Sequence, residues 1–367
     1  MNITRREFIV RSGAAACAVG LRPRALRAGD APPREAMHYE TAEGGLVRCL
    51  LCPRGCAIAP GLRGHCKVRR NDGGKLRTLV FGRPCTFHND PIEKKPLFHF
   101  LPGTTAFSLA TAGCNIECRF CQNWQISQAG PEDVDSVWMP PEDVISRAVR
   151  EGSPSIAYTY SEPVVFYEYV HETARLGKAR GLRSVMITNG FIREKPMRDL
   201  LPHLAAVKVD LKSFTEKFYR DTCDGALAPV LDTLRLLKRT GIWHEVVVLL
   251  VPTLNDSDDE LTGLCRWVKR ELGPSTPLHF TRFHPTYKIR NLPPTPVATL
   301  ERARAIGMRE GLQFVYLGNV PGHPGENTCC PKCGKTLVTR VAYRVDASGI
   351  KNASCRFCGF PIAGVWA

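Results

Sequence analysis

The stretch Cys114-Asn115-Ile116-Glu117-Cys118-Arg119-Phe120-Cys121 carries three cysteines in a C-x3-C-x2-C spacing. The apolar run just before it, Phe107–Thr111, lies between Gly103 and Gly113 and predicts a buried strand. The three thiols therefore lie in a loop after a strand end, where barrel enzymes place their active residues. A cubane iron–sulfur cluster takes four thiolates, so this run leaves one iron open to a ligand from outside the protein. The alternatives are three ligands of a zinc site or a disulfide.

From Ala106 onward, short β-branched runs alternate with longer amphipathic segments, which is typical of parallel βα units. We expect strands at Phe107–Thr111, Ser155–Tyr158, Ser184–Thr188, Ala206–Asp210, Glu245–Val251 and Leu278–Phe283, with a further candidate at Phe314–Leu317. We expect helices at Pro141–Glu151, Val164–Arg180, Lys195–Leu204, Ala226–Arg239, Asp258–Glu271 and Val297–Gly311. This pattern predicts an α/β fold with a partial (β/α)6 TIM-type barrel. Its lateral gap would admit a large substrate, including a protein segment.

The three-cysteine loop, with Phe120 beside the last thiol, resembles the radical S-adenosylmethionine (SAM) family. The resemblance implies that the open iron takes the amino and carboxylate groups of SAM, with Cys114, Cys118 and Cys121 as the catalytic ligands of a [4Fe–4S] cluster. It also implies that Phe120 supports the adenine.

Polar residues follow several of the predicted strands, at the end of a barrel where active residues lie. The expected SAM contacts are Phe120, Glu162, Asn189, Asp210, Lys212 and His284. Glu162 stands in Tyr-Ser-Glu where the family has Gly-Gly-Glu. Each of these residues also has a purely structural explanation when it is considered alone. Glu162 could begin a helix, Asn189 could belong to a turn pair, Asp210 and Lys212 could form a surface ion pair, and His284 could be a loop residue.

A first cysteine cluster precedes the barrel. It comprises Cys49, Cys52, Cys56 and Cys66, with glycines that permit tight turns and several basic residues around it. Four thiols suit either a closed structural zinc site or a second, coordinatively complete cluster, and the sequence does not separate the two. Free thiols are the remaining alternative.

A second cluster follows the barrel, as two C-x2-C-Gly turns around a strand-like segment. Its thiols are Cys330, Cys333, Cys355 and Cys358. The pattern predicts a zinc ribbon, with disulfides as the alternative. The predicted layout is a twin-arginine-like signal and linker at 1–36, an N-terminal cysteine-rich metal module at 37–103, the partial barrel at 104–322 and the ribbon at 323–367.

The chain has 367 residues, sixteen cysteines and a formal charge of +15. We attribute the charge to a basic N-terminus and to the surroundings of anionic cofactors rather than to nucleic-acid binding, because no nucleic-acid motif accompanies it. No run reaches the length of a membrane span. SAM and low-potential electron donors are found in the cytoplasm. The segment Thr4-Arg5-Arg6-Glu7-Phe8-Ile9, however, resembles a twin-arginine export signal, so the sequence does not decide the compartment.

The resemblance narrows at Asp210-Leu-Lys212, which is similar to glycyl-radical-enzyme activases such as the pyruvate formate-lyase activating enzyme. It is closer still to the radical SAM member of the AmmeMemoRadiSam system. That pattern is similar in the Cys49 module, Asp90–Phe100, Cys114–Trp124, Tyr158–Pro163 and Gly318–His323, and so covers nearly the whole chain from about Val47 onward. This implies reductive cleavage of SAM to a 5′-deoxyadenosyl radical that abstracts hydrogen from a substrate, with a low-potential donor such as flavodoxin or ferredoxin. The alternatives are a glycyl-radical activase and, from another class, a non-enzymatic multi-zinc scaffold that binds nucleic acid or protein.

Overall fold

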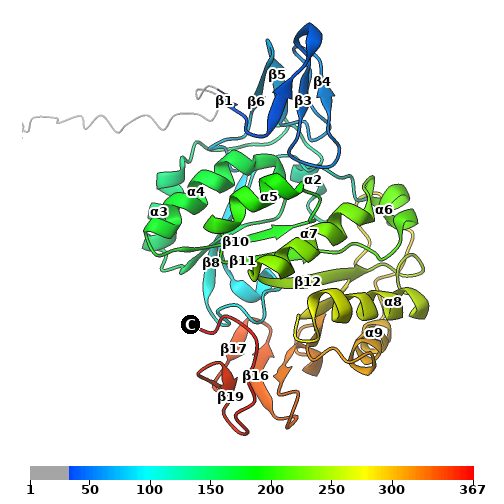
Figure 1. Ribbon diagram of the computed structural model, residues 1–367. Coiled ribbons are helices and arrows are strands. Elements are labelled where there is room, and N and C mark those ends of the chain that lie inside the picture. The colour runs from blue at the N-terminus through cyan, green and yellow to red at the C-terminus, as the bar shows by residue number, and fades with distance from the viewer. Residues whose placement is uncertain (1–32) are drawn as a thin grey trace, which may run out of the picture.

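The structure is a computed structural model, and the residues it describes are 33–367. The twin-arginine motif at Thr4–Ile9 lies outside the described residues. Figure 1 shows three parts: the N-terminal strands at one end, a sheet with helices in the middle, and the C-terminal ribbon at the opposite end. Within residues 33–367, no helix is long and apolar enough to cross a membrane.

The middle part is one eight-stranded sheet in the order β14-β13-β12-β11-β10-β9-β8-β7. Its strands are β7 (Thr86–Pro91), β8 (Thr105–Ala110), β9 (Ser155–Tyr158), β10 (Arg183–Thr188), β11 (Ala206–Asp210), β12 (Trp243–Leu250), β13 (Leu278–Arg282) and β14 (Val315–Gly318). Strands β8 to β14 run parallel, and β7 pairs antiparallel with β8. The expected partial barrel is confirmed, with β14 as an additional parallel strand.

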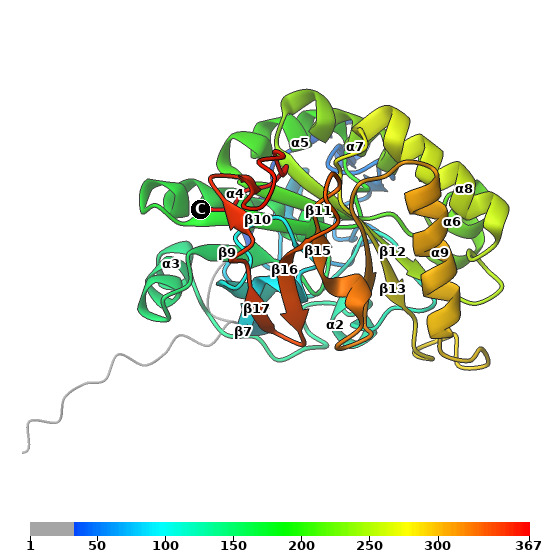
Figure 2. The same ribbon diagram turned by 90° about the horizontal axis from the view of Figure 1, so that it is seen from below.

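Helices connect the parallel strands and cover the outer face of the curved sheet (Figure 2). The helices of this part are α2 (Trp124–Ser127), α3 (Pro141–Arg150), α4 (Tyr167–Ala179), α5 (Glu194–Leu200), α6 (Glu216–Cys223), α7 (Leu227–Thr240), α8 (Asp258–Trp267) and α9 (Val297–Arg309). All four residues of β9 are buried, as expected for a strand covered on both faces. Helix α7 ends at Thr240 and is followed by Gly241, whose φ of 73° few other residues adopt readily.

The N-terminal part consists of two small antiparallel sheets. One contains β1 (Arg34–Glu35), β6 (Lys75–Thr78) and β5 (Arg69–Asp72), and the other contains β2 (Tyr39–Thr41), β3 (Val47–Cys49) and β4 (Ala57–Ile58). Their strands are short, so cysteine-bearing loops make up much of this part.

The C-terminal ribbon contains β15 (Thr328–Cys329), β16 (Thr336–Val341), β17 (Arg344–Asp346), β18 (Ile350–Lys351) and β19 (Ser354–Cys355). Its apolar side packs against Phe98, Phe314 and Tyr316 of the central part. Beneath this contact, the buried Glu245 carboxylate accepts hydrogen bonds from the backbone N–H groups of Phe98 and His99, at 3.0 and 2.8 Å. These bonds fix the segment before β8 between barrel and ribbon.

His99 is fully buried in this contact and is expected to make stability depend on pH. Its ring contacts the Ala363 carbonyl at 2.7 Å and the Tyr316 hydroxyl at 2.5 Å, which fits a neutral imidazole that donates to one and accepts from the other. Burial lowers the pKa of His99 to about 4, although Glu245 and Ala363 oppose that effect. Its contribution is therefore complete above the unfolded-state pKa of about 6.5 and is lost as the pH falls toward 4.

Between about pH 7.5 and 5.5, we expect His99 to account for a loss of roughly 1.5 kcal/mol in the free energy of unfolding. Urea titrations of anaerobically purified protein at the two pH values would measure the loss. The His99→Gln variant keeps a donor and an acceptor but does not titrate, so it should lose less on acidification. Equal losses in the two proteins would contradict the prediction.

Candidate active site

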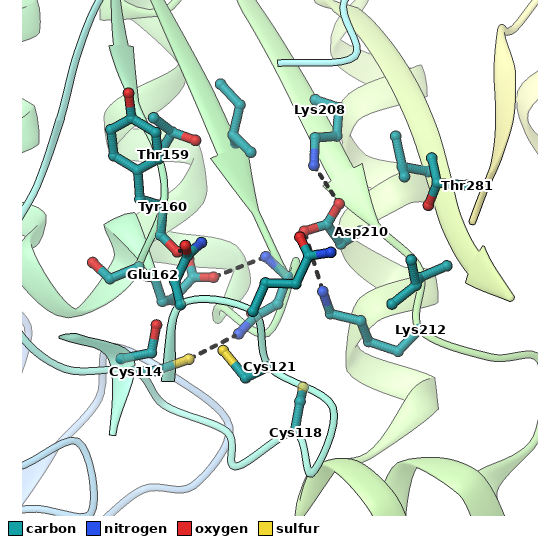
Figure 3. A pocket seen from close by; sticks show the side chains of 18 of the residues that line it. Cys114, Cys118, Cys121, Thr159, Tyr160, Glu162, Lys208, Asp210, Lys212 and Thr281 are labelled. Atoms are coloured by element: carbon teal, nitrogen blue, oxygen red, sulfur yellow. Dashed lines mark hydrogen bonds and ion pairs between the residues drawn. The ribbon is translucent and has the colours of Figure 1, made fainter. Parts of the chain in front are cut away.

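A cavity of about 480 Å³ lies inside the barrel, within the usual size range of ligand sites. The thiols of Cys114, Cys118 and Cys121 line one side of it, in the loop that follows β8. Figure 3 shows these sulfurs facing the charged residues that follow the neighbouring strands. The cavity thus brings together the three thiols and most of the residues predicted to hold SAM.

The three-cysteine loop is held by its own backbone. The N–H groups of Glu117 and Arg119 donate to the carbonyls of Cys223 and Thr222, at the end of α6, over 2.8 and 2.9 Å. Cys223 also lies beside Cys118. The hydrogen bond between the two thiols, together with burial, raises the pKa of Cys118. Cys223 is not one of the residues that line the cavity.

The three thiols are spaced differently from those of the ribbon. Tetrahedral zinc with Zn–S bonds of about 2.3 Å holds its sulfurs about 3.8 Å apart. Within residues 33–367, the only set of three or more ligand atoms that all lie within 4.8 Å of one another belongs to the ribbon. The thiols of Cys114, Cys118 and Cys121 are therefore not as close together as the ligands of a single zinc ion. In a cubane, by contrast, each thiolate binds a different iron.

Glu162 lies in the turn after β9 and is 3% exposed. Its carboxylate accepts hydrogen bonds from the Thr188 hydroxyl at 2.6 Å, from Asn189 N–H at 2.8 Å and from Val164 N–H at 3.1 Å. Burial raises its pKa to about 7, against these hydrogen bonds. Glu162 thereby ties the end of β9 to the end of β10 while its side chain lines the cavity.

Asn189 links this turn to the three-cysteine loop. Its side-chain amide donates to the Asn115 side chain at 2.8 Å and lies 3.8 Å from the Cys114 sulfur. Asn115 in turn donates to the Phe191 carbonyl at 2.7 Å. The position of the first thiol is therefore set by the strand end beside it.

Asp210, the last residue of β11, is shared by two lysines. Lys212 contacts its carboxylate at 3.1 Å, and Lys208 bonds the other oxygen. Burial acts to raise the pKa of Asp210, but the two lysines outweigh it and hold the pKa at about 2. Lys208 was missed in the sequence. It stands two residues before Asp210, so the alternation of side chains along a strand would have placed it on the same face.

A second charged group lies at the cavity wall, in the Asp90–Phe100 segment, to whose residues the sequence assigned no roles. The Lys95 ammonium is buried and contacts Asp90 at 2.5 Å, and Lys94 contacts the other oxygen at 2.9 Å. Tyr160 also donates to Asp90, and its backbone has the uncommon φ of 63°. Burial lowers the pKa of Lys95 to about 8, an effect that Asp90 opposes and that Lys94 and Lys208 reinforce.

The remaining predicted residues fall in different places. Phe120 is buried, lines the cavity and packs on Phe218 with ring centroids 5.7 Å apart. His284, by contrast, is exposed and does not line the cavity, so we leave it out of the proposed site. Tyr343, from the turn between β16 and β17, does line the cavity although it belongs to the ribbon.

The two outer cysteine sets also converge. In the ribbon, the sulfurs of Cys330 and Cys358 lie 3.6 Å apart and those of Cys333 and Cys355 lie 3.7 Å apart, the spacing of a single tetrahedral metal ion. The four N-terminal cysteines line a second, small cavity.

The chain matches several known proteins. A model of the radical SAM superfamily matches residues 108–268. An uncharacterized protein of Methanocaldococcus jannaschii is 46% identical over 328 residues, which are 89% of this chain and 98% of that protein. The pyruvate formate-lyase 1-activating enzyme of Escherichia coli is 24% identical over 223 residues, 56% of this chain and 89% of that enzyme.

Among solved structures, a domain of a pyruvate-formate lyase-activating enzyme from Bacteroides vulgatus aligns with a TM-score of 0.40 and 13% identity, over 44% of this chain and 98% of that one. A radical SAM methyltransferase from Sphaerobacter thermophilus aligns with a TM-score of 0.45 and 18% identity, over 62% and 71%. The family match and the long relative, not these alignments, establish membership: the chain belongs to the radical SAM superfamily, which implies a [4Fe–4S] cluster and SAM.

Proposed function

We propose that this protein cleaves SAM reductively at a cluster held by Cys114, Cys118 and Cys121, and that the resulting 5′-deoxyadenosyl radical abstracts hydrogen from an anionic substrate in the same cavity. The observation that carries the proposal is the cavity itself, which is lined by the three thiols at one side and by paired charges at the other. The cluster and SAM supply the radical chemistry. The barrel supplies orientation and excludes water.

The residues at the strand ends match the groups of SAM by charge. Glu162 offers a carboxylate to the ammonium group, and Lys212 offers an ammonium to the carboxylate. Asp210 holds Lys212 in place, and Asn189 holds the first thiol. Phe120 offers an aromatic face to the adenine.

The substrate end of the cavity is more basic than acidic. Asp90 is shared by Lys94 and Lys95, so this group retains a positive charge. Lys208 adds a further ammonium on Asp210, beyond the Lys212 that is assigned to SAM. Lys95 and Lys208 are 2% and 4% exposed, and both line the cavity. An uncompensated ammonium in a buried site favours an anion, so the proposed substrate carries a carboxylate or phosphate group.

Protein reconstituted anaerobically with iron and sulfide, then given dithionite and SAM, is expected to form 5′-deoxyadenosine. Chromatography of the quenched reaction would measure it. Protein that carries its full complement of iron and forms none would overturn the proposed function.

Small carboxylates and phosphates that fit the site should accelerate this reaction. In the Lys95→Met variant we expect the acceleration to fall about tenfold or more while the basal rate stays close to wild type, because Asp90 keeps Lys94 and Tyr160 as partners. Lys195→Met, on the exposed face of α5, is the matched control. An unchanged response in Lys95→Met would contradict the anionic substrate.

A glycyl-radical activase is the second candidate, because the pyruvate formate-lyase 1-activating enzyme is among the relatives. Incubation with a glycyl-radical enzyme, followed by electron paramagnetic resonance, would test it. A glycyl-radical signal that depends on SAM would support this candidate.

We also propose that the ribbon binds zinc. In Cys333→Ser, metal analysis should show a loss of about one zinc ion per chain, because tetrahedral thiolate sites use all four sulfurs. Cys329→Ser is the control, since Cys329 lies next to the site without belonging to it. Retained zinc in Cys333→Ser would contradict the assignment.

A further inference from the structure

The four N-terminal cysteines form a second site, apart from the candidate active site and the ribbon. Its residues, which we call the N-terminal thiol site, are Cys49, Cys52, Cys56 and Cys66. They come from the end of β3, the loop before β4 and the loop before β5, and they surround one small cavity. The backbone N–H of Cys49 donates to the Cys56 carbonyl at 2.9 Å, which closes the first loop.

A buried arginine in this cavity lacks partners for part of its side chain. Arg69 is 1% exposed and lines the cavity. Its Nη2 donates to Glu168 at 2.8 Å and to the Met37 carbonyl at 2.7 Å, whereas Nε and Nη1 have no acceptor in the protein. Buried donors left unpaired are costly, so their acceptors are expected in the cavity. Thiolates and inorganic sulfides bound to a metal centre would supply them.

The spacing of the thiols points to the kind of centre. In the ribbon, sulfur pairs lie 3.6 and 3.7 Å apart, as zinc requires. Within residues 33–367, no three sulfurs of the N-terminal thiol site all lie within 4.8 Å of one another. The same holds for the thiols of the three-cysteine loop after β8. Both sets are therefore more widely spaced than the ligands of a single zinc ion, as is expected of a centre in which each thiolate binds its own metal atom.

The N-terminal thiol site touches the three-cysteine loop directly. Arg54, between Cys52 and Cys56, donates from Nε to the carbonyl of Asn115. Gly113, the residue before Cys114, packs closely against the backbone of Cys66. There is no room for a side chain between them, because a Cβ on residue 113 would lie only 2.8 Å from the Cys66 carbonyl oxygen. The loops of the two sites are therefore in van der Waals contact immediately next to Cys114.

We propose that the N-terminal thiol site holds a second [4Fe–4S] cluster, bound by four cysteines, that relays electrons to the cluster of the three-cysteine loop. Four thiolates complete its coordination, so it has no open iron for SAM and is suited to electron transfer. The relay rests on the proposed function, whereas the identity of the cluster does not.

The electron balance is simple. A low-potential one-electron donor of the flavodoxin or ferredoxin class reduces the N-terminal cluster by one electron, and that electron passes to the cluster of the three-cysteine loop. There it is consumed when one carbon–sulfur bond of the sulfonium breaks, which gives neutral methionine sulfur and the carbon radical. No proton is transferred. Exposed Arg48, Arg63 and Lys67 beside the site would favour an acidic donor protein.

Metal content tests the cluster without any substitution. Anaerobically reconstituted protein should contain about eight iron atoms and about one zinc per chain, because each cubane holds four irons and the ribbon holds zinc. About four irons and two zinc ions would overturn the assignment. Mössbauer spectroscopy would show whether all the iron belongs to cubane clusters.

Two variants then locate the clusters. The triple variant Cys114→Ala, Cys118→Ala, Cys121→Ala should keep about four irons and the absorbance near 400 nm. The double variant Cys52→Ala, Cys56→Ala should keep the SAM-binding cluster, which electron paramagnetic resonance would show as a spectrum that shifts on adding SAM. A triple variant without iron would overturn the second cluster.

The relay is tested by the choice of reductant. With dithionite, a small reductant that reaches either cluster, the double variant should still form 5′-deoxyadenosine. With reduced flavodoxin, its rate should fall at least about tenfold relative to wild type. Equal rates with flavodoxin would overturn the relay. Wild-type protein that contains both clusters but cleaves no SAM would instead overturn the proposed function and leave the cluster assignment intact.

Discussion

Cys118→Ala is expected to reduce 5′-deoxyadenosine formation by roughly 10³-fold or more, because the cofactor carries the chemistry and its ligands cannot be spared. Cys118 is 7% exposed, lines the cavity and lies in the middle of the three-cysteine loop. Its loss leaves two thiols for a cluster that needs three protein ligands and one from SAM. Anaerobic reconstitution followed by chromatography of the products would measure the effect.

The control for this variant is Cys265→Ala. Cys265 is fully buried in α8 and lines neither cavity, so its replacement tests the loss of a thiol without the loss of a ligand. We expect it to keep the wild-type rate within a few-fold. If Cys118→Ala formed product at the rate of Cys265→Ala, the three-cysteine loop would not hold the catalytic cluster.

Asp210→Asn should both weaken SAM binding and destabilise the protein. Lys208 and Lys212 share this carboxylate, and their side chains are 5% and 17% exposed. Removing its charge leaves two ammonium groups without their counter-ion, a change that costs about 3–5 kcal/mol at buried pairs. Burial acts to lower the pKa of Lys212, but Asp210 and the nearby thiols outweigh it and raise the pKa, so this lysine stays charged in the wild type.

A double variant separates the two effects of Asp210. In Lys208→Met, Asp210→Asn, one buried ammonium is removed together with the carboxylate, so stability should recover by about half or more. SAM binding should not recover, because Lys212 still lacks the carboxylate that positions it. Urea titration would report the first effect and calorimetric titration with SAM the second. A single variant with wild-type stability and SAM affinity would contradict both expectations.

The strands of the barrel were predictable from the sequence because both faces of a parallel strand are buried. The runs at Ser155–Tyr158 and Ala206–Asp210 match β9 and β11 at both ends. Strand β7 was missed because Thr86–Pro91 is polar and half exposed, and it pairs antiparallel at the edge of the sheet. Helix α6 was missed because it is short and begins at a single threonine cap.

The candidate site residues that stand next to a strand end in the sequence could be predicted in the same way as the strands. Glu162, Asn189 and Asp210 follow or end buried strands, and all three line the cavity. The role of Lys95 could not be predicted from the sequence. Lys95 lies in a loop before β8, and its contact with Tyr160 joins residues that are 65 positions apart in the chain. The non-enzymatic scaffold that the cysteine pattern also allowed is set aside, because the chain is a radical SAM enzyme.

The contact of Tyr343 with the cavity has a practical consequence. The turn that carries this side chain is on a separate small module, and Tyr343 itself is 58% exposed. Exchanging only this turn for that of a relative would reshape the entrance while leaving the thiols, the strand ends and the barrel untouched. We therefore expect this turn to be a place where the cavity can be altered from the periphery of the molecule, at a position where substitutions rarely harm folding.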